Sequence, residues 1–301
     1  MHFSLQSCQR VDPPHQAAGP TRLIPVESGR MWVDTEYLSL LAQAGLSSFE
    51  SVMATGSGRV LRTLRDRENR RLELDDGRGL RGMYLKKHFI RSWRHWLRAR
   101  LGLGPGETPG RIEAINVERL EQAGIAAMRL AAYGQRLRVD GVAESFVLTE
   151  ELAGYVQLDH FLRKQFPELA PLIARRRDRR LDRLIAAAAD VAGRFHQHGF
   201  NHRDLYCCHF FILEPSRGRF LVNLIDLQRV ERRHWFRRRW VVKDLAQLAY
   251  SAPRERVTRT HRLAFIKHYL GIRKLRREDK RLIRQVLAKQ RSMERRLGVH
   301  P

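Results

Sequence analysis

The chain has 301 residues, 43% of them hydrophobic, which is enough to bury one large domain or two lobes and excludes a disordered chain. Its formal net charge is +25, with 57 Lys and Arg residues against 32 Asp and Glu, and only eight of the basic residues are lysines. Arginine makes planar, bidentate contacts with phosphate and carboxylate groups. We therefore expect a polyanionic partner, such as an anionic lipid headgroup, a phosphorylated sugar or nucleic acid.

Three cysteines in a chain of this length exclude a disulfide framework and are typical of a reducing cytosol. The first thirty residues lack the continuous apolar core of a signal peptide. No stretch approaches the ~18 apolar residues that a membrane-spanning helix needs. These features predict a protein that is soluble or peripheral to a membrane.

The N-terminal half has the pattern of an irregular leader followed by a β-rich region. Residues 1–30 are rich in proline and glycine, and Gly56-Ser57-Gly58 predicts a hairpin turn. One helix, closed by Gly124, interrupts the strands. The predicted elements are helices near 34–44 and 111–123 and strands at 51–55, 59–64, 72–74, 80–89, 126–134 and 144–152.

The C-terminal half is mainly helical. Apolar residues from Leu181 to Phe195 recur at helical spacing, and Gly199 ends that helix. A strand pair at 209–213 and 220–226 and helices at 243–251, 258–270 and 278–297 follow. A β-rich lobe before a helical lobe is the layout of the protein-kinase-like fold, so we predict an α+β protein of two lobes. The predicted division is a leader at 1–30, a nucleotide-binding N-lobe at 31–151 and a C-lobe at 152–301.

The segment His202-Arg203-Asp204 lies between the long predicted helix and the strand pair, and Asp226 ends that pair. Two carboxylates at the two ends of one hairpin can converge on one cleft. Phosphoryl transfer uses such a pair, one to orient the acceptor hydroxyl and accept its proton and the other to hold Mg²⁺ against the nucleotide phosphates. The alternative is a surface turn with an Arg–Asp pair.

Three runs, HRDLYCCHFFI (202–212), LIDLQRV (224–230) and WVVKDLAQLAYSA (240–252), resemble the lipopolysaccharide core kinase family, which includes heptose and Kdo kinases. The similarity extends upstream through MYLKKH, IEAINVERLEQAGI and SFVLTEEL, and covers roughly residues 50–270. The resemblance implies a protein-kinase-like fold, ATP and Mg²⁺ as cofactors, and transfer of a phosphoryl group to a sugar.

By position, the resemblance implies that Asp204 is the catalytic base and that Asp226 binds Mg²⁺. Lys86 takes the place of the phosphate-binding strand lysine and Glu113 that of its ion-pair partner. Lys87 remains the alternative, because strand alternation turns only one of the two lysines toward the cleft.

Five further residues complete the implied nucleotide and metal site. Glu150 and Leu152 lie in the hinge segment 149–152, where backbone groups would meet adenine, and Gly56 and Gly58 would be a reduced glycine-rich loop. His209 stands where protein kinases carry a metal-binding asparagine, although imidazole is a poor Mg²⁺ ligand. Asp244 resembles the buried helix aspartate that braces the catalytic loop.

The stretch QRVERRHWFRRRWVVK (228–243) combines arginines with aromatic residues, which suits an anionic, amphipathic acceptor at a membrane surface. We assign acceptor binding to Arg237, Arg238 and Arg239; the alternative is a solvated basic loop.

The sequence thus predicts an ATP-dependent kinase of a lipopolysaccharide inner-core sugar, heptose or Kdo, in the cytoplasm and peripheral to the inner membrane. Its expected partners are ATP, the anionic glycolipid acceptor and the membrane surface, with nucleic acid disfavoured. One alternative is a kinase of another small molecule or of protein. The other is a catalytically silent basic module that binds lipid or nucleic acid, which salt-sensitive nucleic-acid binding without ATP turnover would reveal.

Overall fold

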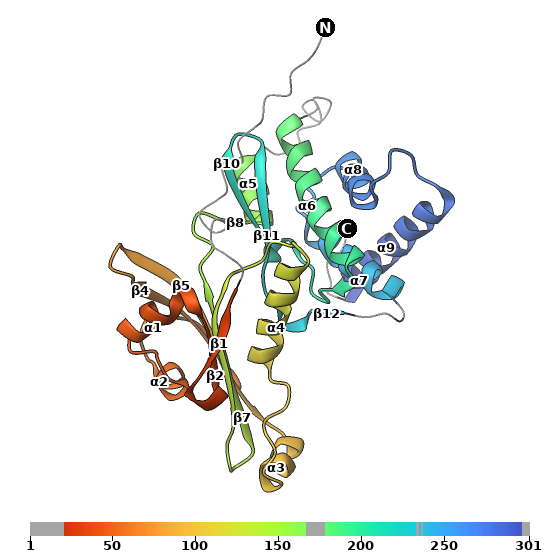
Figure 1. The fold of residues 1–301 in the computed structure, drawn as a ribbon. Helices are drawn as coiled ribbons and strands as arrows, with labels where there is room; N and C mark the ends of the chain where they lie inside the picture. Colours follow the sequence, from red (N-terminus) through yellow and green to blue (C-terminus); the bar gives the residue numbers. More distant parts are fainter. Residues whose placement is uncertain (1–20, 167–177, 233–234, 236, 297–301) are drawn as a thin grey trace.

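An antiparallel sheet of seven strands, in the order β1-β2-β6-β7-β5-β4-β3, forms the N-terminal lobe. The computed structural model describes residues 21–166, 178–232, 235 and 237–296, and Figure 1 shows this lobe beneath a helical one. The strands are β1 (Leu23–Val26), β2 (Met31–Asp34), β3 (Arg59–Leu64), β4 (Arg67–Asp75), β5 (Leu80–Arg91), β6 (Leu130–Leu137) and β7 (Val142–Glu150).

Helices cover the two faces of this sheet (Figure 1). The short helices α1 (Leu38–Gln43) and α2 (Phe49–Ala54) lie on one face, where Phe49 joins a buried cluster with Met83 and Leu85 of β5. The longer α4 (Pro109–Gln122) lies on the other face. Because side chains alternate along a strand, Lys86, between Leu85 and Lys87, points toward α4.

The predicted strand at 51–55 is wrong, because residues 51–54 belong to helix α2 and Thr55 is its C-cap. Ser48 caps that helix with a reciprocal pair of bonds: the Ser48 hydroxyl accepts from the Ser51 N–H at 3.0 Å, and the Ser51 hydroxyl accepts from the Ser48 N–H at 3.1 Å. Gly56-Ser57-Gly58 therefore connects a helix to a strand. The hairpin turn of this region lies instead between β3 and β4, at residues 65–66.

Several elements of the structure were not predicted from the sequence. Part of the predicted leader, Leu23–Val26, pairs with β2 and extends the sheet, whereas residues 1–20 lie outside the described residues. Strand β6 begins at Leu130 and not at residue 126, because the segment before it bonds to the C-terminal lobe. The other missed elements are α3 (Trp93–Arg100), α5 (Leu158–Gln165), β8 (Val156–Gln157), β9 (Phe200–Asn201) and β12 (Glu231–Arg232).

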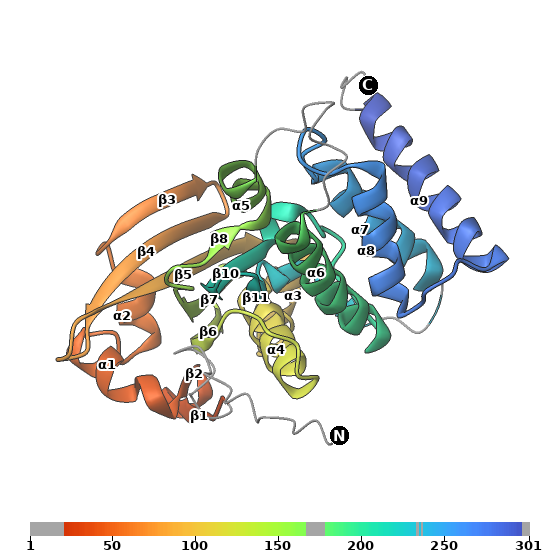
Figure 2. The same cartoon turned by 90° about the horizontal axis from the view of Figure 1, so that it is seen from above.

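The helices of the C-terminal lobe lie next to one another in Figure 2. They share one apolar core, in which Leu184, Phe195 and Leu245 are buried. The predicted hairpin is present as β10 (Phe210–Ser216) and β11 (Arg219–Leu224). The major helices are α6 (Arg179–Gln197), α7 (Arg237–Ser251), α8 (Arg259–Leu270) and α9 (Arg277–Arg296). The predicted α+β class, a β-rich lobe followed by a helical one, is confirmed. Over the described ranges, no helix is long and apolar enough to span a bilayer.

Candidate active site

The segment that carries Asp204 is held from beneath by a buried carboxylate. Asp244 of α7 accepts the N–H of His202 at 2.7 Å and the N–H of Arg203 at 2.9 Å, and it is fully buried. Arg203 has a φ of 69°, a left-handed conformation that costs a non-glycine residue about 1 kcal/mol or more. The two bonds to Asp244 fix this bend, as the sequence predicted for that residue, and thereby set the backbone from which Asp204 projects.

Lys86, Glu113 and Asp226 meet between the two lobes. The Lys86 Nζ lies 2.7 Å from a Glu113 carboxylate oxygen and 3.3 Å from an Asp226 oxygen. Burial acts to lower the pKa of Lys86, but the two carboxylates outweigh it and the pKa is raised. Burial likewise acts to raise the pKa of Asp226, but the Lys86 and His209 charges hold it below its usual range. Lysine and aspartate therefore both stay charged at neutral pH.

Lys87 has a different environment. Its Nζ donates to the Thr55 carbonyl at 2.8 Å and lies 3.3 Å from Glu68, on the face of β5 that packs against α2. The geometry thus separates the two lysines that the sequence left as alternatives, and it is Lys86 that contacts Glu113 and Asp226.

His209 contacts the backbone of Asp204 and lies near the carboxylate of Asp226. Its Nδ1 is 2.6 Å from the Asp204 carbonyl, and its Nε2 is 3.7 Å from an Asp226 oxygen. The described residues contain no group of three or more His, Cys, Asp or Glu side chains that could hold a metal on their own. Mg²⁺ in nucleotide sites is commonly bound by one or two carboxylates together with substrate phosphates, so Asp226 fits such an ion. A ligand role for His209 stays a prediction.

Arg229 lies in the candidate site, although no individual role was predicted for it. Its guanidinium lies 2.6 Å from an Asp204 carboxylate oxygen. It stands three residues after Asp226 in the basic stretch, and this spacing is the signal that could have identified it. The candidate base therefore has a cation beside it, at the start of the segment expected to bind an anionic acceptor.

The three arginines predicted to bind the acceptor, Arg237, Arg238 and Arg239, contact other parts of the C-terminal lobe. The Arg237 guanidinium donates to the His196 carbonyl at the end of α6, and the Arg238 Nε donates to Gln285 of α9 at 2.8 Å. Arg239 is exposed, with its guanidinium 5.9 Å from the Trp240 ring. Two of the three side chains thus bind the helical lobe itself, and the acceptor role of the triplet remains a prediction.

The glycine-rich loop assigned to Gly56 and Gly58 requires correction. The Gly56 carbonyl accepts from Arg70 at 2.6 Å, and a Cβ at Gly58 would lie 2.3 Å from the Arg71 carbonyl, so glycine is needed there for packing against β4. The turn that covers the Asp226 segment is the one between β3 and β4. Arg67, the first residue of β4 after this turn, has its Nη1 3.4 Å from the Gln228 Oε1, and the turn residues 65–66 include no glycine.

The hinge side chains are occupied by structural contacts. Glu150 accepts from the Tyr37 hydroxyl at 2.6 Å, and the next glutamate is paired with Arg71 at 2.7 Å. The Leu152 N–H, in contrast, donates to no acceptor among the residues that the structure describes. A free backbone donor in this position suits the acceptor nitrogen of an adenine ring, and the adenine contact of the hinge stays a prediction.

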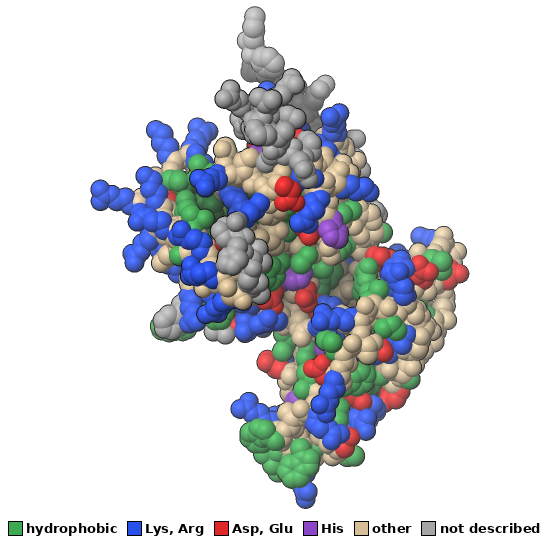
Figure 3. Space-filling model, turned by 180° about the vertical axis from the view of Figure 1, so that it is seen from behind, with side chains coloured by type: hydrophobic (Ala, Val, Ile, Leu, Met, Phe, Trp, Pro, Cys, Tyr) green, Lys and Arg blue, Asp and Glu red, His purple; other side chains and the backbone are tan. Residues whose placement is uncertain are grey.

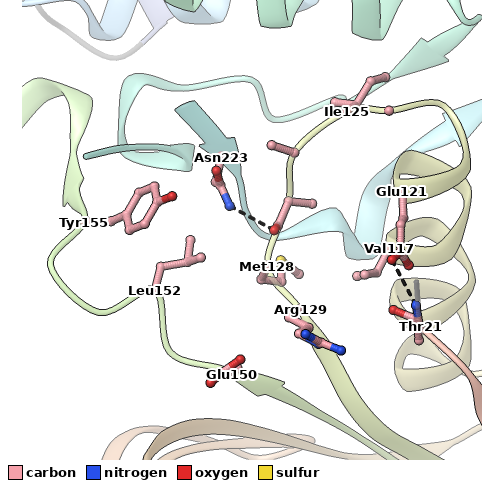
Figure 4. A pocket seen from close by; sticks show the side chains of 13 residues that line it. Thr21, Val117, Glu121, Ile125, Met128, Arg129, Glu150, Leu152, Tyr155 and Asn223 are labelled. Atoms are coloured by element: carbon pink, nitrogen blue, oxygen red, sulfur yellow. Dashed lines mark hydrogen bonds between the residues drawn. The ribbon is translucent and has the colours of Figure 1, made fainter. Parts of the chain in front are cut away.

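Glu150, Leu152 and Tyr155 also line a pocket of about 290 Å³ between the hinge and the end of α4 (Figure 4). The pocket includes none of Lys86, Asp204 and Asp226, and it shares only the hinge residues with the candidate site. Cys207 is fully buried and burial raises its pKa to about 12, so it stays a protonated packing residue.

The fold and the site together define a kinase of the protein-kinase-like class, with a lysine–glutamate pair in the β-rich lobe and two aspartates beneath it. The sequence profile of the lipopolysaccharide kinase (Kdo/WaaP) family matches residues 52–269, and the chain belongs to that family.

Two curated relatives are named lipopolysaccharide core heptose(I) kinase WaaP. The Pseudomonas aeruginosa protein is 34% identical over 228 residues, which cover 75% of this chain and 81% of the relative. The Escherichia coli K12 protein is 29% identical over 220 residues, covering 72% and 79%. A solved structure described as WaaP in complex with acyl carrier protein has a TM-score of 0.66 at 32% identity, over 87% of this chain and 98% of that one. The predicted resemblance is confirmed.

His202 makes the stability of the C-terminal lobe dependent on pH. The side chain is fully buried, its Nε2 lies 3.1 Å from the Ile225 carbonyl, and burial lowers its pKa to about 4 from 6.5. The unfolded chain therefore binds the proton first as the pH falls. The contribution of neutral His202 to the free energy of unfolding is complete above pH 6.5 and is lost as the pH drops toward 4. We expect about 2 kcal/mol of unfolding free energy to be lost between pH 7.5 and about pH 5 from this residue.

Urea unfolding at the two pH values measures this loss. His202→Gln retains a donor for the Ile225 carbonyl but does not titrate, so its stability should change less over the same interval. His88, whose pKa is also lowered to about 4 by burial, accounts for a remaining slope. An unchanged pH difference in His202→Gln would contradict the assignment.

Proposed function

We propose that this kinase transfers the γ-phosphate of ATP to a hydroxyl group of the lipopolysaccharide inner core, with heptose as the sugar favoured by the names of its relatives. The observation that carries the proposal is the convergence of Lys86, Glu113 and Asp226 between the lobes, with Asp204 on the adjoining loop. A protein that only binds lipid or nucleic acid has no use for this arrangement.

Each residue then has a defined task. Lys86, oriented by Glu113, would bind the nucleotide phosphates, and the Leu152 N–H would receive the adenine. Asp226 would hold Mg²⁺, which supplies positive charge against the phosphoryl group during transfer. Asp204 would accept the proton of the acceptor hydroxyl as its oxygen bonds to the γ-phosphorus and ADP leaves. Arg229, displaced from Asp204 by that hydroxyl, would face the anionic groups of the acceptor.

The acceptor is a membrane glycolipid, so we also propose that the protein works at the inner-membrane surface as a peripheral protein. The net charge of +25 favours an anionic surface.

A direct assay separates this function from its alternatives. Purified protein is incubated with labelled ATP and with lipopolysaccharide that carries unphosphorylated core heptose, truncated lipopolysaccharide that ends at Kdo, or protein substrates. We expect transfer to the heptose-containing acceptor, with a product one phosphoryl group heavier. Transfer to the truncated acceptor alone would assign Kdo as the sugar. Transfer only to protein, or salt-sensitive nucleic-acid binding without ATP turnover, would overturn the proposal.

A second binding function is favoured by a large apolar cavity in the C-terminal lobe. The cavity has a volume of about 780 Å³ and is lined by residues of α5, α6, α7, α8 and α9. Its lining includes Leu162, Ile185, Leu248, Phe265 and Val286, and several arginines stand among them. Because the solved relative is in complex with acyl carrier protein, we propose that this cavity receives the acyl chain of such a carrier.

Titration with carriers that differ only in the attached chain tests this second proposal. Each buried methylene contributes about 0.8 kcal/mol, so a long-chain acyl carrier should bind more than about tenfold more tightly than the unacylated one. Equal affinities for the two carriers would mean that the cavity takes no acyl chain.

A further inference from the structure

Helix α3 exposes the side chains that a helix of a soluble protein normally buries. Trp93 is 70% exposed, Trp96 49% and Leu97 43%, and Leu101, just after the helix, is 63% exposed. The half-buried positions of α3 are instead His95, Arg98 and Ala99. This reversed pattern leaves a large apolar face toward solvent, which in a soluble protein marks an interaction site.

The apolar face is held in a fixed position. Ser92 caps the helix by accepting the N–H of His95, and the His95 ring lies 3.2 Å from the Ile90 carbonyl of β5. The turn between β6 and β7 packs against the helix so closely that a Cβ at Gly141 would lie 2.7 Å from the Trp96 Cα. Val139 of that turn is 97% exposed and adds a further apolar side chain near the helix. The tryptophans are therefore presented on a rigid support.

Positive charge surrounds this face. Residues 91–106 contain four arginines and no acidic residue. The Arg94 guanidinium lies 5.6 Å from the Trp93 ring and that of Arg100 lies 5.0 Å from the Trp96 ring. The neighbouring acid, Asp140, is paired with Arg138 at 3.0 Å. Tryptophan and leucine bordered by arginine is the composition of segments that insert into the headgroup region of anionic bilayers.

The position of α3 suits a surface that also carries the acceptor. The helix forms the far tip of the N-terminal lobe in Figure 1. Seen from behind, a cluster of apolar side chains marks this tip, Lys and Arg side chains crowd the same flank of the helical lobe, and the molecule is hollowed between them (Figure 3). A flat anionic surface along this flank would contact both the apolar tip at α3 and the basic side chains of the helical lobe, and it would face the hollow between them.

We propose that α3 and the adjoining turn at Val139 form a membrane-docking tip that inserts into an anionic phospholipid surface. This inference deepens the proposed function and rests on it only for the choice of membrane. The tip lies outside the residues assigned to phosphoryl transfer, so the two proposals can fail separately. Docking would hold the open cleft against the bilayer from which a glycolipid acceptor projects.

The test uses the full chain and vesicles of phosphatidylethanolamine with phosphatidylglycerol, compared with vesicles of phosphatidylcholine alone. Co-sedimentation gives the bound fraction, and lipids with brominated chains report insertion by quenching tryptophan fluorescence. The test variant is Trp93→Ser/Leu97→Ser. Its matched control is Leu80→Ser/Val60→Ser, which removes two other exposed apolar side chains, 69% and 45% exposed, away from α3 and from the basic stretch 228–243. Both variants are assayed for phosphoryl transfer to a soluble, delipidated core oligosaccharide.

We expect wild type and control to bind the anionic vesicles and to be quenched, and the test variant to bind at least about tenfold more weakly with reduced quenching. Its transfer to the soluble acceptor should be unchanged. Absence of wild-type binding to anionic vesicles would overturn the proposal in favour of a protein partner for this face. Equal binding by the test variant, or a loss confined to the control, would place the docking surface elsewhere. If no variant phosphorylates any acceptor but the vesicle results hold, the proposed function fails and the docking tip stands.

Discussion

Asp204→Asn is expected to lower kcat by about 10²- to 10⁴-fold while nucleotide binding and folding are retained, because general-base catalysis contributes a factor of that size. The amide has the shape of the carboxylate but cannot accept the proton of the acceptor hydroxyl. Its oxygen can still accept from Arg229, which lies 2.6 Å from the present carboxylate. The local arrangement should therefore survive the substitution.

The measurement combines turnover with labelled ATP, titration of a fluorescent nucleotide and the melting temperature. Asp190→Asn is the matched control, because Asp190 is an exposed aspartate of α6 whose carboxylate also pairs with an arginine, Arg194, at 3.0 Å. It should leave turnover unchanged, since exposed pairs of this type contribute roughly 0.5 kcal/mol or less. Turnover of Asp204→Asn within a few-fold of wild type would remove Asp204 from the role of base.

The candidate site could be predicted largely because its residues lie in short, ordered motifs. Asp204 and Asp226 are separated by one hairpin, and a hairpin brings its two ends together whatever the remainder of the chain does. Asp244 could be placed because a charged residue inside an otherwise apolar helix must find buried donors, and it finds the two N–H groups beside Asp204.

Other features depend on contacts that no local pattern shows. The segment around Val52 has the apolar residues of a strand, and the capping bonds of Ser48 turn it into a helix. Because this segment is a helix, Gly56 and Gly58 lie in a connection between a helix and a strand. The turn between β3 and β4 takes the position over the nucleotide that was predicted for them. Long-range contacts also decide which arginine of the basic stretch binds which partner. Arg229 pairs with Asp204, whereas Arg237 and Arg238 bind α6 and α9. The sequence shows many arginines in this stretch and does not show which of them makes each contact.

Helix α3 could not be predicted from the sequence, because its apolar side chains do not face the core. Sequence patterns identify a helix by the side that it buries, and α3 buries almost nothing apolar. Only the structure shows that its tryptophans and leucines face solvent, which is what makes the segment informative about a partner.

Lys86→Met should reduce kcat/KM for ATP by about 10²- to 10³-fold, because it removes a preorganised positive charge from the phosphate site. Methionine has nearly the length of lysine, so the substitution leaves only a small cavity where the lysine side chain was. Lys87→Met is the matched control on the same strand. Its ammonium contacts Thr55 and Glu68 on the opposite face of β5, so the change should lower the melting temperature but leave the KM for ATP nearly unaltered.

Glu113→Gln then tests whether the lysine works as one half of an ion pair. Glu113 is fully buried and its carboxylate lies 2.7 Å from the Lys86 Nζ, so the amide should orient the lysine less well and lower kcat/KM by about tenfold. Once Lys86 is replaced, the glutamate has no lysine left to orient. The double variant should therefore be no less active than Lys86→Met alone, which corresponds to a coupling energy of about 1–2 kcal/mol. Losses that simply add would mean that Glu113 acts through another group, and a larger defect in Lys87→Met would transfer the phosphate-binding role to that residue.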